Sequence, residues 1–199
     1  MSKLVTVVGV SGVGKTALAQ ALARAFPFET AYEGHADRPF QALFKADSRY
    51  ALANQIDYFL FRAEQEKRLR ASPRLGLIDG GLDLDLHGFT RLFHKRCLLT
   101  DAEFELCQRV YNGLRQVLPP PELIVHLYAD ERTVVNRLSA RDRINIAKAQ
   151  DTTLFNASIN EWLTTISPAH MVALDVSEET LDYERSVNIV LERMQSSLL

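Results

Sequence analysis

The stretch LVTVVGVSGVGKT, residues 4–16, decides the fold class. Leu4–Val8 are almost all apolar and β-branched, which predicts a strand buried on both faces, as in a parallel sheet. Residues 9–16 match the pattern G-x-x-x-x-G-K-[ST] in full. A stretch rich in alanine and leucine, residues 15–25, then predicts a helix, which Pro27 ends. A strand, a glycine loop and a helix in this order are the context in which such a loop binds phosphate.

Each part of this loop is suited to holding a nucleoside triphosphate. Glycines let backbone N–H groups turn inward around an anion, and the following helix adds the positive end of its dipole. Lys15 supplies a positive charge to the outer phosphates, and the Thr16 hydroxyl is an oxygen ligand suited to Mg²⁺. The alternative, a glycine turn with a chance lysine, is disfavoured by the context. Contacts to the nucleotide are expected from Gly9, Ser11, Gly12, Val13, Gly14, Lys15 and Thr16.

Composition narrows the class of protein. The 199 residues predict a single domain over 1–199, and the net charge of −2 gives no field for non-specific binding of nucleic acid. No run of about 18 apolar residues is present that would cross a membrane. Cys97 and Cys107 cannot form a zinc cluster or a disulfide framework, and we expect two reduced, mostly buried thiols. We therefore expect a cytoplasmic protein without a nucleic-acid or membrane partner.

Short apolar runs alternate with amphipathic stretches along the rest of the chain, which is typical of a sheet covered by helices. The predicted fold class is α/β, with a five-stranded parallel sheet and helices on both faces. Strands after the first are predicted at residues 30–33, 75–78, 123–127 and 171–174. Helices after the first are predicted at residues 41–70, through most of 80–118, at 131–140 and at the C-terminus.

Two carboxylates are predicted at strand ends. In an open parallel sheet, ligands bind beyond the carboxyl ends of the strands, so Glu33 and Asp79 should face the phosphate loop. Phosphoryl transfer needs one group that accepts the nucleophile's proton and another that holds Mg²⁺. These two carboxylates can supply both roles. The alternatives are a solvated loop residue for Glu33 and a strand-end cap for Asp79.

Three arginines follow the fourth predicted strand closely. Arg137 and Arg141 share one helical face because they are four residues apart, and Arg143 comes next. A flap over about 137–150 would use such groups on a phosphate in transfer, because negative charge accumulates on the moving oxygens. A solvated basic surface is the alternative, and the phosphate loop upstream favours the flap.

These motifs, in their order and spacing, resemble the deoxynucleoside kinase family from the first strand to about Trp162. The similarity includes Tyr32–Glu33, the segment LFKADSRYA at 43–51 followed by Gln55, PELIVHL at 121–127 and RLSARDR at 137–143. The resemblance implies a P-loop kinase fold with an arginine-rich lid. It implies transfer of the ATP γ-phosphate to the 5′-hydroxyl of a deoxynucleoside, with Mg²⁺ as cofactor, by a protein that is a homodimer.

The resemblance also implies roles for single residues. Glu33 would accept the proton of the 5′-hydroxyl, and Asp79 would serve Mg²⁺ with Thr16, directly or through water. Gln55 would read the edge of the base, and Phe89 would stack on its face, roles that suit an amide and an aromatic ring. The alternatives are a core aromatic for Phe89 and a hydrogen bond to loop backbone for Gln55. The groups expected to act on the transferring phosphate are Lys15, Arg137, Arg141 and Arg143.

Arg62 and Asp85 fall where members that accept deoxycytidine and purine nucleosides carry an arginine–aspartate pair. A guanidinium held by a carboxylate can donate to a ring nitrogen or carbonyl. The pair predicts a preference for purine deoxynucleosides or deoxycytidine over thymidine. The alternative is a surface salt bridge.

The chain departs from the family pattern at three places. Gly80-Gly81 follow Asp79 where the family usually has Arg-Ser, and that arginine helps to hold the reacting 5′ end. Phe44 replaces a tyrosine that bonds the sugar 3′-hydroxyl, and Asn145-Ile146 replace a glutamate that shares this task. Four polar residues near the altered motif could compensate, although helix-surface polarity explains each as well: Asp83, His87, Arg91 and His94.

Because lost hydrogen bonds weaken discrimination between sugars, two other functions stay open. One is a kinase for another small acceptor, such as a ribonucleoside or a nucleoside monophosphate, for which Arg38, Arg62 and Arg91 could supply extra cations. The other is a non-catalytic nucleotide-binding subunit.

Overall fold

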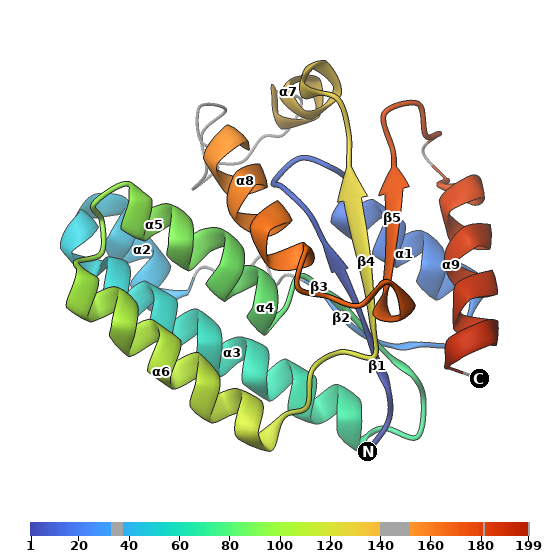
Figure 1. Cartoon of the computed structure of the whole chain (residues 1–199), viewed down its shortest axis with the longest axis horizontal. Coiled ribbons are helices and arrows are strands. Elements are labelled where there is room, and N and C mark those ends of the chain that lie inside the picture. Colours follow the sequence, from blue (N-terminus) through green and yellow to red (C-terminus); the bar gives the residue numbers. More distant parts are fainter. Residues whose placement is uncertain (33–37, 140–151, 181, 199) are drawn as a thin grey trace.

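A computed structural model describes residues 1–32, 38–139, 152–180 and 182–198 and shows one parallel sheet flanked by helices (Figure 1). The strand order is β2-β3-β1-β4-β5, and each neighbouring pair is parallel, as predicted. All five carboxyl ends therefore lie at one edge of the sheet. The strands are β1 (Leu4–Val8), β2 (Glu29–Ala31), β3 (Gly76–Asp79), β4 (Leu123–Tyr128) and β5 (Met171–Asp175).

Helices cover both faces of the sheet (Figure 1). α1 (Lys15–Ala25) and α9 (Glu184–Ser197) pack together on one face. α3 (Ala51–Ala71) and α8 (Thr152–Leu163) lie on the other, and α6 (Asp101–Val117) packs outside α3. The remaining helices are α2 (Pro39–Ala46), α4 (Leu82–Leu84), α5 (Arg91–Lys95), α7 (Glu131–Ser139), the π-helical stretch Asp85–Thr90 and two 3₁₀ turns, Ser48–Tyr50 and Pro168–His170. Among the described residues, no helix is both long and apolar enough to cross a bilayer.

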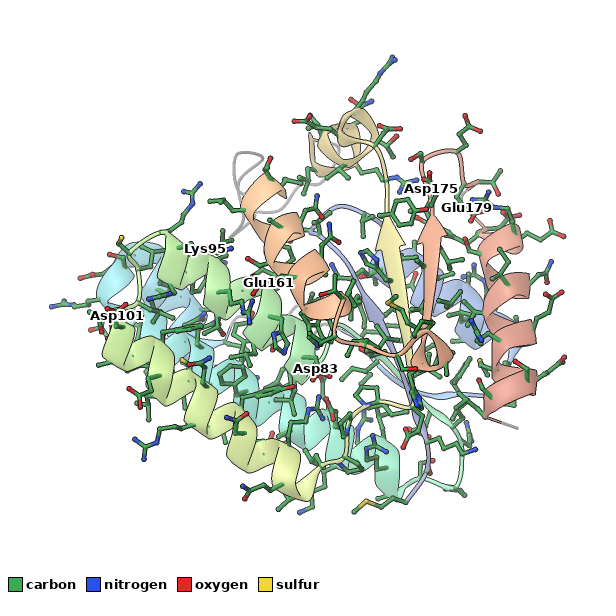
Figure 2. All side chains as sticks on the ribbon, viewed as in Figure 1. Asp83, Lys95, Asp101, Glu161, Asp175 and Glu179 are labelled. Atoms are coloured by element: carbon green, nitrogen blue, oxygen red, sulfur yellow. The ribbon has the colours of Figure 1, made fainter. Side chains whose placement is uncertain are left out.

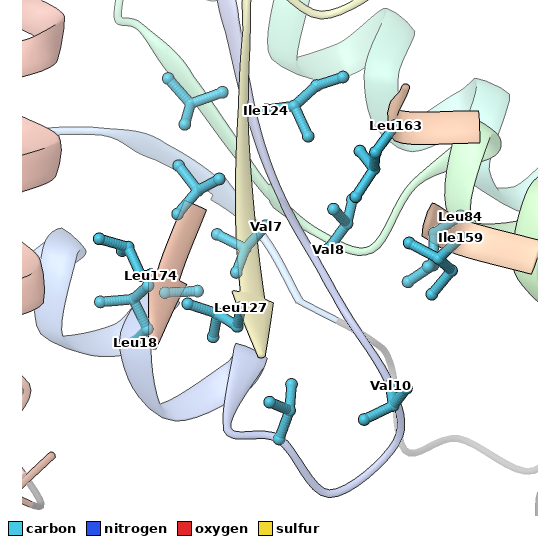
Figure 3. Packing of buried hydrophobic residues seen from close by; sticks show 14 of the residues in the cluster. Val7, Val8, Val10, Leu18, Leu84, Ile124, Leu127, Ile159, Leu163 and Leu174 are labelled. Carbon is cyan, nitrogen blue, oxygen red and sulfur yellow. The ribbon is translucent and has the colours of Figure 1, made fainter. Parts of the chain in front are cut away.

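The core fills the space between the sheet and both helical layers. All five residues of β1 are buried, which explains why its sequence is a continuous apolar run rather than an alternating one. In Figure 3, Val7 lies with Leu18 of α1, whereas Val8 lies on the opposite side, near Ile159 and Leu163 of α8. Burying each such side chain contributes roughly 1.5–3 kcal/mol. The sheet that carries the phosphate loop is thus held rigidly from both faces.

The long helix predicted over residues 41–70 is divided in the structure. α2 ends at Ala46, and Asp47 adopts an extended backbone with φ −152°. Its side chain accepts a hydrogen bond from the Arg49 N–H at 2.9 Å, which caps a short 3₁₀ turn before α3 begins at Ala51. A local side-chain cap therefore competes with continuation of the helix.

The two cysteines differ in exposure. Cys107 is buried on α6, as expected, and burial raises the pKa of its thiol to about 11. Cys97 is exposed, so the expectation of two mostly buried thiols is wrong for it. It follows α5 with φ +56°, and its N–H bonds to the carbonyl of His94 in the turn that leads toward α6. Turns of this kind lie at the surface, where the backbone reaches water.

Candidate active site

The loop between β1 and α1 has the backbone that its glycines allow. Gly9, Gly12 and Gly14 have φ values of +146°, +87° and +112°, which residues with a side chain rarely adopt. The Lys15 side chain folds back across the loop, and its Nζ donates to the carbonyls of Gly9 at 3.0 Å and Val10 at 3.1 Å. These bonds hold a positive charge beside the loop's inward-turning backbone.

Asp79 meets the start of α1 because of the register of the sheet. β3 pairs with β1 so that Asp79 lies opposite Val7, at the end of the strand that leads into the loop. Asp79 is 0% exposed, and the Thr16 hydroxyl donates to its Oδ2 at 2.5 Å. The two residues predicted to serve magnesium are therefore adjacent, although they lie 63 positions apart in the sequence.

These oxygens fit Mg²⁺ better than a metal that needs several protein ligands. No cluster of three or more histidine, cysteine, aspartate or glutamate residues suited to a metal occurs within the described part of the chain. Mg²⁺ usually keeps several waters and is held by one or two protein oxygens together with substrate phosphates. A buried carboxylate with a neighbouring hydroxyl, next to an anion-binding loop, supplies that donor set.

A pocket joins the phosphate loop to the residues expected to hold a nucleoside. It brings together side chains from α1, α3 and the segment after β3, which belong to separate motifs in the sequence. Its lining consists of Ser11, Lys15, Thr16, Arg62, Gly80, Leu84 and Phe89. One space is thus bordered by an anion-binding loop, a buried guanidinium and an aromatic ring.

The pair of Arg62 and Asp85 is inside the molecule. Arg62 Nε lies 3.4 Å from Asp85 Oδ2, and the two side chains are only 3% and 4% exposed. A surface salt bridge is therefore the wrong interpretation. Gln55 is also buried, and its Nε2 donates to the Thr90 hydroxyl at 2.9 Å. That hydroxyl in turn donates to the Asp85 carbonyl at 2.8 Å, so Gln55 belongs to the same network, and among the described residues it has no direct bond to loop backbone.

The two aromatic residues expected near the nucleoside pack differently. Phe89 is half-buried, lines the pocket and contacts Phe155 edge-on, with ring centroids 4.8 Å apart. This packing fixes the ring while one part of it faces the pocket. Phe44 on α2 packs against Phe93 at 5.0 Å, so it contributes an apolar contact where a tyrosine could have donated a hydrogen bond.

Arg137 connects the phosphate loop to the segment after β5. Its Nη1 donates to the Val13 carbonyl at 2.6 Å, and its Nη2 donates to the Val176 carbonyl at 2.9 Å. The guanidinium thus lies next to the loop, as the flap interpretation requires. Glu33, His35, Arg141, Arg143 and Asn145-Ile146 lie outside the described residues.

The segment after Gly81 is fixed by a buried charge network that the sequence analysis missed. Arg115 on α6 donates from Nη1 to Glu66 Oε2 and from Nη2 to Asp83 Oδ2, each at 2.7 Å. Tyr111 donates to Asp83 Oδ1 at 2.5 Å, and the Leu82 N–H points to Glu66 Oε1 at 3.4 Å. Asp83, labelled in Figure 2, is the middle residue of α4. The sequence gives only a weak signal for this network, because a glutamate and an arginine on predicted helices are usually interpreted as solvent-exposed side chains.

Burial and charge act against each other in this network. Burial raises the pKa of Glu66, and the charge of Arg115 opposes that rise. Burial alone lowers the pKa of Arg115, but the charges of Asp83 and Glu66 outweigh it and raise that pKa overall. Arg115 therefore stays protonated and holds two buried carboxylates.

The four polar residues near the altered motif are all engaged elsewhere. Asp83 belongs to the network above, and Arg91 pairs with Glu161 at 3.0 Å. His94 contacts Asp101 at 2.8 Å. His87 stacks on Trp162 with centroids 4.9 Å apart, and burial lowers its pKa to about 4. None of the four lines the pocket beside the phosphate loop.

Comparisons with known proteins agree with this geometry. The family model for deoxynucleoside kinase matches residues 5–199. The chain is 26% identical to a deoxyadenosine kinase of Dictyostelium discoideum over 169 residues, covering 82% of this chain and 67% of that protein. It is 19% identical to a deoxyadenosine/deoxycytidine kinase of Bacillus subtilis (strain 168) over 202 residues, covering 98% and 93%.

A solved structure shows the same fold. The deoxyadenosine kinase from M. mycoides with bound dCTP superposes with a TM-score of 0.80 at 15% identity, covering 97% of this chain and 99% of that one. Together with the family match over nearly the whole length, the phosphate loop and the pocket beside it lead to one conclusion. The chain belongs to the deoxynucleoside kinase family and is an enzyme that phosphorylates deoxynucleosides.

Proposed function

We propose that this enzyme transfers the γ-phosphoryl group of ATP to the 5′-hydroxyl of a deoxynucleoside and favours purine deoxynucleosides or deoxycytidine over thymidine. The observation that carries this proposal is the shared pocket, in which Lys15 and Thr16 face Arg62 and Phe89. A donor phosphate on the loop and an acceptor beside Phe89 would then be neighbours. Catalysis of this transfer is mostly positioning and charge stabilisation.

The phosphate end of the donor is assigned to the loop. The loop amides and Lys15 bind the phosphates, and Thr16 and Asp79 hold magnesium, either directly or through water. Mg²⁺ held there would supply positive charge that offsets the negative charge developing on the phosphates. Arg137 fixes the loop against the segment after β5. We assign Arg141 and Arg143 a role on the transferring phosphate, as part of a lid at about 137–150 of this single domain.

The acceptor end is assigned to Glu33 and the residues of α3. The carboxylate of Glu33 takes the proton of the 5′-hydroxyl as the oxygen attacks phosphorus. Residue 32, immediately before it, is held against α3, because Gln65 Nε2 donates to the Tyr32 carbonyl at 3.0 Å. Gln55 reads the base edge and Phe89 stacks on its face, while Phe44 gives the sugar an apolar neighbour.

The base preference rests on the buried pair of Arg62 and Asp85. A guanidinium oriented by a carboxylate can donate to a ring nitrogen or carbonyl. Because the Arg62 guanidinium is buried, a base that offers it no acceptor would bind more weakly. Relatives that carry the names deoxyadenosine, deoxycytidine and deoxyguanosine kinase support this preference. All three cations that a monophosphate acceptor would use are paired with carboxylates, since Arg38 binds Asp57 through two nitrogens, Arg91 pairs with Glu161 and Arg62 with Asp85. We further expect a homodimer in the cytoplasm.

A coupled assay of ADP release tests the acceptor. The panel contains the four deoxynucleosides, the ribonucleosides and their monophosphates, each with MgATP. We expect turnover with purine deoxynucleosides or deoxycytidine at a kcat/KM well above that for thymidine. Turnover with monophosphates alone would overturn the proposal, and equal turnover of thymidine and deoxyadenosine would overturn the base preference.

A second assay tests Glu33. Glu33→Gln should lower kcat by about 100-fold or more, because a positioned base contributes roughly 100- to 10,000-fold. Binding of ATP, measured by calorimetry, should stay unchanged. Glu105→Gln, at an exposed position on α6, is the matched control. An unchanged rate in Glu33→Gln would remove this residue from the role of base.

A further inference from the structure

The Arg62 guanidinium lies between the base side and the phosphate side of the pocket. Its side chain is 3% exposed, yet it lines the same pocket as Ser11, Lys15 and Thr16. A Cβ placed on Gly80 would lie 3.1 Å from Arg62 Nη2 and 3.5 Å from its Cζ. The guanidinium therefore sits directly over Gly80, in space that a side chain at this position would need.

Gly80 is held in that position by the sheet. Its N–H donates to the Val7 carbonyl at 2.9 Å, and the buried Thr6 hydroxyl donates to the Gly80 carbonyl. With φ +90°, its backbone also favours glycine. Gly80 directly follows Asp79 in the sequence. The Arg62 guanidinium therefore lies over the residue next to the one whose carboxylate accepts from Thr16.

Asp85 and Gln65 are among the residues that orient the guanidinium. On one side, Nε faces Asp85 Oδ2 at 3.4 Å, and on the other, Nη1 donates to Gln65 Oε1 at 3.0 Å. Nη2 is the nitrogen nearest to Gly80. Because the guanidinium is planar and its donors diverge in a fixed fork, it can face Asp85 with one edge and the phosphate side with another.

We propose that Arg62, besides contacting the base, also contacts the 5′-oxygen and the transferring phosphoryl group, and that Gly80 makes this contact possible. This inference rests on the proposed function. In the transfer, the bond from the 5′-oxygen to the γ-phosphorus forms as the bond from that phosphorus to the β,γ-bridging oxygen breaks. The 5′-proton passes to Glu33, and ADP leaves with the electron pair of the broken bond. Arg62 keeps its charge throughout and stabilises the oxygens on which negative charge grows.

Gln65 links this arginine to the proposed base. The same side chain that accepts from Arg62 donates to the Tyr32 carbonyl, immediately before Glu33. Gln65 is therefore a positioning residue: it sets the start of the segment that carries Glu33 relative to the guanidinium.

Substitution of Arg62 separates the phosphoryl role from a role in base reading alone. In Arg62→Met, kcat should fall by about 100-fold or more on every acceptor that the wild type uses, as for the loss of one positioned donor to a developing charge. KM for ATP should change by less than about threefold, because binding to the loop is retained. A changed ranking of bases with kcat on the best acceptor within about threefold of wild type would overturn the inference.

Binding gives a readout that does not depend on turnover. MgADP with aluminium fluoride and the best acceptor mimics the phosphoryl group in transfer, and calorimetry measures its affinity. Arg62→Met should bind this combination at least about tenfold more weakly, with MgADP alone unaffected, because catalytic interactions strengthen toward the transition state. An equal affinity of wild type and variant for the mimic would contradict the proposal.

Controls cover folding and the proposed function itself. Arg109→Met replaces an exposed arginine on α6 and should leave kcat and the melting temperature unchanged. If Arg62→Met does not fold, Arg62→Lys retains a positive charge beside Asp85 but loses the fork. It should lower kcat at least about tenfold, and wild-type kcat in it would refute the inference. Failure of the wild type to phosphorylate any deoxynucleoside would instead overturn the proposed function, and this inference with it.

Discussion

Replacement of Arg115 by methionine should destabilise the fold strongly, and the structure sets the size of the effect. The guanidinium contacts Glu66 and Asp83 at 2.7 Å each, and these carboxylates are only 1% and 8% exposed. Arg115→Met keeps a side chain of similar length but leaves two buried negative charges without their cation. Breaking a buried ion pair in this way costs about 3–5 kcal/mol, with Tyr111 retaining one hydrogen bond to Asp83.

Thermal and urea unfolding followed by circular dichroism measure this loss. For a chain of this size, about 3–5 kcal/mol corresponds to a fall in melting temperature of roughly 6–20 °C. Glu66→Gln combined with Arg115→Met should recover part of the loss, because it removes one of the two stranded charges. Arg109→Met on the same helix should change the unfolding free energy by less than about 0.5 kcal/mol.

The pH dependence has a definite sign. Burial already raises the pKa of Glu66 in the folded protein, and loss of Arg115 removes an opposing charge. A carboxyl whose folded pKa is raised binds protons more readily when folded, so its destabilising effect grows as the pH rises through that folded pKa. The deficit of Arg115→Met should therefore be larger at pH 8 than at pH 5. A loss below about 1 kcal/mol, or a larger deficit at pH 5, would refute this reasoning.

Two further substitutions test other parts of the structure. Gly14→Ala should abolish nucleotide binding measured by calorimetry, because Gly14 has φ +112° and a Cβ there would collide with the Tyr183 hydroxyl; retained binding would contradict this. Gly113→Ala on α6 serves as the control, because a Cβ there meets open space, and it should stabilise the fold by about 0.5–1 kcal/mol. His87 has a pKa of about 4 because of burial, so wild-type stability should fall as the pH drops from 6.5 toward 4. His87→Phe, which cannot titrate, should lose up to about 1.4 kcal/mol less per pH unit in that window, and parallel stability curves would argue against the assignment.

Local patterns in the sequence determined what could be predicted of the fold. β1 and the phosphate loop were predictable because a buried parallel strand and a glycine loop each leave a signature within a few residues. The break at Asp47 was missed because Asp47 reads equally well as a polar position on a helix. Its capping of Arg49 depends on a backbone angle that the sequence does not display.

Contacts between distant segments limited what could be predicted of the site. Its place at the end of a predicted strand brought Asp79 into the predicted site, and the family resemblance added Arg62 and Asp85, which the structure shows as a buried pair. It could not show that Arg62 lies over Gly80, since this depends on how α3 packs against β3. The Arg115 network joins three helices through side chains, for which helical periodicity gives no signal.

Phosphorus NMR of the reaction products is the sharpest test of the proposed chemistry. Wild-type enzyme is incubated with MgATP and each of the four deoxynucleosides, and Lys15→Met serves as the inactive reference. We predict a new resonance of a nucleoside 5′-monophosphate, formed in step with ADP, for at least one purine deoxynucleoside or deoxycytidine. Release of inorganic phosphate without any 5′-monophosphate from the four nucleosides would contradict the assignment of this pocket to phosphoryl transfer.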